Sequence, residues 1–189
     1  MANLLKRPAA ATDWRFRRWL GAPRRLARRR GFGIHSPFAF DFVRRVINQP
    51  CRYYCYPLLD EAARRTGIRR SVLRLVFRVA LFFQPCDVRI FGDADGYDDA
   101  VREALPDGCD RTGPSMMVVA QHVDGKMLDD VLACAASGGI VVIAGRKHLP
   151  DVARAVWVNA ARGMMFRGSD VAVYVGMQHL PRQLFNIWI

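Results

Sequence analysis

Two glycines four residues apart, Gly92 and Gly96, mark the segment best suited to bind a ligand. They follow a short apolar segment, Val88–Phe91, which we expect to form a β-strand, and they precede a segment with helical periodicity. In open α/β sheets, ligands lie beyond the carboxyl ends of the strands, where glycines let the backbone come close to them. Asp93 and Asp95 in the same turn disfavour a phosphate but are compatible with a cationic group such as a sulfonium. The alternative is a solvated acidic turn that only caps the helix.

Alternating helices and strands are expected to position this turn. The hydrophobic periodicity predicts helices over residues 14–20, 37–48, 57–65, 72–83, 97–105, 126–136 and 151–161. It predicts strands over residues 87–91, 116–120, 139–143, 164–167, 171–177 and 184–189. Strands and helices that alternate in this way are typical of an α/β fold with a parallel or mixed sheet and crossover helices.

The positive charge of the chain is concentrated at its N-terminal end. The net charge is +12, and residues 1–30 contain ten basic residues and a single acid, Asp13. We therefore divide the chain into three parts. Residues 1–30 are a basic arm, partly disordered or helical, and residues 31–86 are an N-terminal helical extension. Residues 87–189 are an α/β core that forms one globular unit with the extension.

The basic arm has two readings as a binding segment. Its Lys and Arg residues are interleaved with Trp14, Phe16 and Trp19 between residues 6 and 30. Basic and aromatic side chains together suit the phosphates and exposed bases of a nucleic acid. They equally suit an anionic membrane surface, where tryptophans lie at the interface. A basic helix that docks on the domain by its aromatic face is the alternative without a partner.

Several classes of protein are not expected. The apolar runs are shorter than the roughly 18–20 residues that span a bilayer, and the first basic residues are not followed by the apolar segment of a secretory signal. The five cysteines are scattered, which predicts reduced thiols and a cytoplasmic protein. The four histidines are dispersed as well, so we expect no metal site.

Residues 33–41 (GIHSPFAFD) and 53–56 (YYCY) resemble the N-terminal signature of a bacterial family of class I S-adenosylmethionine-dependent methyltransferase-like proteins. The resemblance resumes over residues 73–96 and again over residues 170–189. It implies a Rossmann-like class I methyltransferase sheet and S-adenosylmethionine as the possible cofactor. By the same resemblance, Gly92 and Gly96 belong to the cofactor loop, and Asp107 takes the acid that binds the ribose hydroxyls. No catalytic residue is assigned.

The chain also departs from the family pattern. Ile90 stands where the first strand would end in a carboxylate, residues 120–123 lack the family's acid, and Ala144-Gly145 replaces a pair of acids. If the cofactor binds, Asp93 or Asp95 has to replace the missing strand-end acid. The middle is shortened by about one strand–helix segment. These losses favour a degenerate member with weakened or lost catalysis, a pseudoenzyme, and the alternative function is a binding module that uses the basic arm.

Three further groups have open interpretations. Tyr53, Tyr54 and Tyr56 either stack over a bound adenine or pack the helical extension on the sheet. His35 is expected to cap or pack, because no acid partner lies near it in the sequence. Residues 146–148 either contact an anionic substrate or form a solvated loop.

Overall fold

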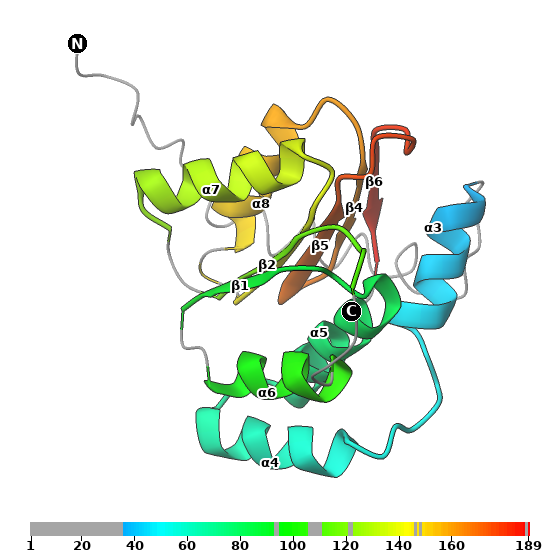
Figure 1. Ribbon diagram of the computed structural model, residues 1–189, viewed down its shortest axis with the longest axis vertical. Coiled ribbons are helices and arrows are strands. Elements are labelled where there is room, and N and C mark those ends of the chain that lie inside the picture. The colour runs from blue at the N-terminus through cyan, green and yellow to red at the C-terminus, as the bar shows by residue number, and fades with distance from the viewer. Residues whose placement is uncertain are drawn as a thin grey trace, which may run out of the picture.

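The first described element is a short helix of the extension. The computed structural model describes residues 36–92, 95–105, 111–120, 123–145, 147, 149–187 and 189 (Figure 1). Helix α3 (Pro37–Phe42) begins where the sequence predicts, because the Ser36 hydroxyl oxygen accepts a hydrogen bond from the Ala39 amide at 3.3 Å. Pro37 occupies the first turn, where an amide hydrogen would have no intrahelical partner.

The predicted helix over residues 37–48 does not remain α-helical. Its second half, Val43–Ile47, is a turn of π-helix, η1. The carbonyls of Val46 and Ile47 at its end accept hydrogen bonds from the side chain of Arg78. A guanidinium that satisfies these end carbonyls is one physical reason why this looser turn is stable here.

Two antiparallel helices complete the extension. Helices α4 (Tyr56–Thr66) and α5 (Arg70–Phe83) are separated by a short connection in which Gly67 has a φ of 72°, a left-handed conformation that favours glycine. The periodic apolar face predicted for the second helix is buried. Its buried residues are Val72, Leu73, Leu75, Val76, Phe77, Val79, Ala80 and Phe83.

The core is a six-stranded mixed sheet, which confirms the predicted α/β class. Its strands are β1 (Val88–Phe91), β2 (Met116–Val119), β3 (Ile140–Ala144), β4 (Met164–Arg167), β5 (Val171–Val175) and β6 (Gln183–Asn186), in the order β1-β2-β3-β5-β4-β6. The first three are parallel, β5 is antiparallel to both of its neighbours, and β6 is parallel to β4. This arrangement is compatible with a Rossmann-like fold.

Helices cover both faces of the sheet (Figure 1). α6 (Asp95–Ala104) packs with α4 and α5 against one face, and α7 (Gly125–Ala136) packs with α8 (Leu149–Asn159) against the other. Alternate residues of each strand supply the two apolar clusters. One of these clusters joins buried residues of the extension to those of the sheet, so the two segments share a core. No helix in the described part of the chain has both the length and the apolar character needed to cross a bilayer.

The two crossovers between the parallel strands have opposite hands. Both β1–α6–β2 and β2–α7–β3 join neighbouring parallel strands, and both move in the same direction across the sheet. Their helices lie on opposite faces. Two right-handed crossovers that move in one direction would place both helices on the same face. One of the two is therefore left-handed, which occurs in roughly 2% of such connections.

The sheet ends at β1. Of the described residues between α6 and β2, Gly113 forms an isolated parallel bridge with Pro85, and the others belong to no strand. In the described part of this connection, the chain passes from β1 through α6 to the adjacent β2. This path agrees with the shortened middle predicted from the sequence, and it places β1 at an edge of the sheet.

Candidate functional site

The turn after β1 has the geometry that the sequence predicts. Gly92 directly follows the strand and has a φ of 126°, which side chains other than glycine rarely adopt. Asp93 lies outside the described residues. Helix α6 begins at Asp95, two residues before its predicted start, and the exposed Asp95 and Asp98 in its first turn interact favourably with the helix dipole.

Gly96 is required for packing within the protein. A β-carbon built on it would lie 3.0 Å from the Ile68 Cδ1 atom and 3.0 Å from the Thr66 Oγ1 atom. Both residues belong to the end of α4 and the connection to α5. Nearby, Arg65 Nη2 of α4 and Asp99 Oδ2 of α6 form an ion pair at 2.6 Å. The first turns of α6 are therefore held closely against the helical extension.

The carboxyl end of β3 is apolar and closed by its own backbone. Ala144 is buried, and Gly145 has a φ of 100°. The Gly145 amide donates a hydrogen bond to the Asp170 carbonyl at 3.0 Å, and the Gly145 carbonyl accepts one from the Leu149 amide at 3.1 Å. The position that carries two acids in the family pattern thus has no polar side chain to offer a ligand.

Asp170 is an acid at this edge that the sequence reasoning missed. It is the one charged residue in the described part of the chain that is buried, and its carboxylate forms an ion pair with Arg69. Arg69 lies in the connection between α4 and α5, next to Ile68, which touches Gly96. The extension therefore reaches from the turn after β1 to the start of β5. In the sequence, Asp170 stands between Gly168 and an apolar strand, which is the pattern that could have indicated a buried acid. A solvated loop has the same pattern, so the sequence does not distinguish the two.

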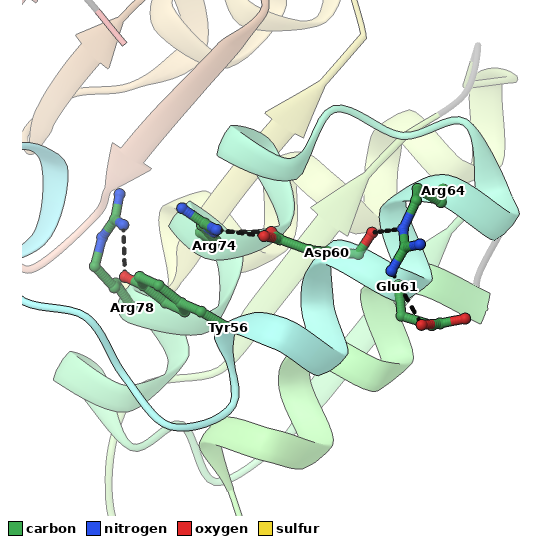
Figure 2. Close-up of polar contacts among 6 residues, drawn as sticks. All are labelled: Tyr56, Asp60, Glu61, Arg64, Arg74 and Arg78. Carbon is green, nitrogen blue, oxygen red and sulfur yellow. Dashed lines mark hydrogen bonds and ion pairs between the residues drawn. The ribbon is translucent and has the colours of Figure 1, made fainter.

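A second group of polar contacts joins α4 and α5 within the extension (Figure 2). Arg74 donates two hydrogen bonds to the Asp60 carboxylate, at 3.0 and 2.6 Å, and its guanidinium lies 4.5 Å from the centre of the Tyr56 ring. Arg78 donates to the Tyr56 hydroxyl oxygen at 2.9 Å in addition to the carbonyls of η1. These two arginines are thus engaged within the protein, whereas Arg70, two turns before Arg78 on the same helix, is exposed.

The tyrosine loop mainly serves packing. The rings of Tyr53 and Tyr56 lie 5.1 and 6.1 Å from the ring of Phe77, centre to centre. Phe77 belongs to α5, so these two residues pack within the extension, and these contacts are not with the sheet. Tyr54 is fully exposed and has no such contact.

The thiol and histidine chemistry of the described residues is limited. Burial raises the pKa of the Cys134 thiol to about 11, so this thiol remains protonated at neutral pH. In the described part of the chain, no three His, Cys, Asp or Glu side chains are grouped as metal ligands. Several predicted site residues fall outside the described residues: Asp93, Asp107, the arm over residues 1–30, His35, and Arg146 and His148.

Comparisons with known proteins give no further assignment. No family model, no curated protein and no solved structure matches this chain.

Proposed function

We propose that this protein is a class I S-adenosylmethionine-dependent methyltransferase-like protein in which catalysis is weakened or lost. The proposal rests on the resemblance of its N-terminal signature and on the order of its sheet. If Gly92 and Gly96 still admit the cofactor, Asp93 or Asp95 replaces the missing strand-end acid, and Asp107 binds the ribose.

The position of β1 at the sheet edge carries the proposal. In a complete doubly wound sheet of order 3-2-1-4-5-6, the first strand lies inside the sheet, and the two halves of the chain place their helices on opposite faces. Removal of the second and third strands, which is one strand–helix segment more than the sequence suggests, leaves the first strand at an edge and joins its helix directly to the fourth strand. The helices after strands one and four then lie on opposite faces. α6 and α7 have this relation, so a deletion of this kind explains the left-handed crossover.

The same deletion weakens a cofactor site. The deleted second strand is the one that would position the ribose acid, so Asp107 would have to bind the ribose without it, and the family's other acids are absent at Ile90 and at Ala144-Gly145. Each hydrogen bond between such an acid and the cofactor contributes about 1.5–3 kcal/mol to the binding free energy. The loss of two or three such groups reduces affinity by several powers of ten. Methyl transfer also needs the sulfonium held in line with its acceptor, and a missing wall removes that orientation.

Thermal unfolding with and without millimolar S-adenosylmethionine or S-adenosylhomocysteine tests the proposal. A ligand at about 100 times its Kd stabilises a protein by about 2.7 kcal/mol, which for this length raises Tm by several degrees. For a pseudoenzyme we expect a cooperative transition and a far smaller shift. A shift of several degrees with either ligand, together with methyl transfer at the rate of an ordinary enzyme, about 1 s⁻¹ or faster, would show that catalysis has been retained and that this proposal is wrong.

The alternative function is a binding module for RNA or an anionic membrane surface. Its specific support is the charge of residues 1–86: the extension over residues 31–86 adds nine arginines and only three acids to the ten basic residues of the arm. Such a segment attracts phosphates in a salt-dependent way.

Deletion of residues 1–30 separates the two functions. The full chain and the shortened chain are compared for binding to single-stranded RNA and to vesicles with phosphatidylserine, at low and high salt. Loss of salt-sensitive binding on deletion supports the module and identifies its ligand. An enzyme would keep cofactor binding without the arm. Equal binding by both chains would contradict a role for the arm.

A further inference from the structure

No described strand pairs with the outer side of β1, where some of its backbone groups point. Among the described residues, β1 pairs only with β2. The carbonyls of Asp87 and Phe91 accept hydrogen bonds from the amides of Met116 and Ala120 on that side, both at 2.8 Å. Because backbone groups alternate in direction along a strand, Val88 directs its amide and carbonyl away from β2, and Ile90 does the same.

The side chains of β1 are also less covered than those of its neighbours. Every residue of β2, β3 and β5 is buried, whereas Val88, Ile90 and Phe91 are each partly exposed. A partly exposed apolar strand at a sheet edge is a surface on which another strand can add. Figure 1 shows β1 at the border of the sheet, with α6 below it and no further labelled strand beyond.

The charges on this edge favour a second copy of the same strand. Asp87 and Arg89 are two residues apart, both are about half exposed, and Asp87 Oδ2 lies 3.3 Å from Arg89 Nε. Since they are two residues apart along the strand, their side chains share one face. An antiparallel copy in which Val88 faces its own copy brings each Asp87 carboxylate directly opposite the other copy's Arg89 guanidinium. Two copies of an edge with charges of one sign would repel each other in this arrangement.

We propose that β1 pairs antiparallel with β1 of a second copy, so that one sheet continues through a twofold dimer. Val88 and Ile90 supply the hydrogen bonds across the twofold axis, and Asp87 and Arg89 supply reciprocal ion pairs. An isologous contact of this kind is closed, which limits the assembly to two chains. Dimer formation covers the edge of β1 that the shortened middle leaves exposed. This pairing does not depend on cofactor binding.

Charge exchange across the edge tests the dimer. The mass of the full chain, 21.4 kDa as a monomer, is followed by sedimentation over a concentration series in nuclease-treated samples. Asp87→Arg gives a strand with two positive charges, and Arg89→Asp gives one with two negative charges. Each variant alone should dimerise about tenfold more weakly than the wild type, because two attractive pairs become repulsive. An equimolar mixture of the two variants, and the double variant, should dimerise like the wild type.

A proline substitution tests the backbone pairing independently. Val88→Pro removes an amide that points away from β2, which an edge strand tolerates, so the fold is kept while pairing between copies is lost. Circular dichroism and Tm verify the fold of each variant. A wild-type chain that remains monomeric at its highest soluble concentration overturns the proposal. A dimer that neither the charge variants nor Val88→Pro weaken uses another surface and overturns it as well.

Discussion

Replacement of Arg78 by methionine should destabilise the whole protein although the residue is not among the predicted cofactor-binding residues. Its guanidinium donates hydrogen bonds to the carbonyls of Val46 and Ile47. It also donates one to the hydroxyl oxygen of Tyr56 (Figure 2). It therefore joins η1, α4 and α5. Methionine keeps most of the aliphatic length and packing volume, so the substitution mainly removes the polar contacts.

The expected loss follows from the number and type of these contacts. A hydrogen bond from a charged donor contributes about 1.5–3 kcal/mol, and an acceptor left unpaired in a partly buried site adds its desolvation cost. Arg78 is only partly buried, so water replaces part of what is lost. We expect a net fall of about 3 kcal/mol in the free energy of unfolding. At this chain length, a loss of about 3 kcal/mol corresponds to a fall in Tm of roughly 6–12 °C.

Urea unfolding followed by circular dichroism, together with a thermal scan, measures this change. Arg70→Met is the matched control: Arg70 is exposed on the same helix, and no hydrogen bond or ion pair joins it to another described residue. Its removal from a helix N-terminus should leave stability unchanged or slightly higher. Arg78→Lys should recover only part of the loss, because an ammonium lacks the planar fork of the guanidinium.

A double-mutant cycle with Tyr56→Phe assigns the coupling to the individual contact. The sum of the losses in the two single variants should exceed the loss in the double variant, since each single substitution removes the same hydrogen bond. If Arg78→Met costs no more than Arg70→Met, the hydrogen bonds of Arg78 do not stabilise the extension, and the reasoning fails.

Three further substitutions test other parts of the fold. Gly96→Val should cost about 1–3 kcal/mol, because its β-carbon meets Ile68 and Thr66, while Gly125→Val, where no atom lies within 4 Å, should stay within about 0.5 kcal/mol in urea unfolding. Asp170→Asn should cost more than Asp87→Asn by about 1 kcal/mol, because Asp170 is buried against Arg69 and Asp87 is exposed; equal losses would contradict this. Burial raises the pKa of Cys134 from 9.0 to about 11, so the unfolded thiol loses its proton first and the stability of the wild type should fall as the pH rises through that window. Cys134→Ser should reduce this slope, leaving the contribution of Tyr174, whose pKa burial also raises, and an unchanged slope would refute the assignment.

The sequence predicts the element types well because periodicity and caps are local. The apolar repeat of α5 and the cap at Ser36 are encoded within a few neighbouring residues, and both are confirmed. The strand–glycine–helix turn at Gly92 is confirmed for the same reason. Element ends are less accurate: α6 starts two residues early, and β6 spans Gln183–Asn186 rather than residues 184–189.

What the sequence could not supply depends on contacts between distant segments. The π-helical turn η1 depends on Arg78, more than 30 residues away, and no local pattern indicates it. The same holds for the pair of Arg69 and Asp170, which are about 100 residues apart. The strand order was not predictable either, because a β–α–β segment of ordinary length is expected to be right-handed.

Retention of Gly92 and Gly96 does not by itself indicate that a cofactor binds. Gly92 adopts a positive φ that this turn needs with or without a ligand, and a β-carbon on Gly96 would meet the helical extension. Both glycines are therefore explained by folding alone. The acids are different, because a carboxylate at a strand end costs stability unless a partner satisfies it. Under the proposed function, the apolar residues at Ile90 and at Ala144-Gly145 are what selection for stability, without a cofactor to bind, would produce. The proposal thus has the fold keep the backbone of a ligand site whose chemistry is lost.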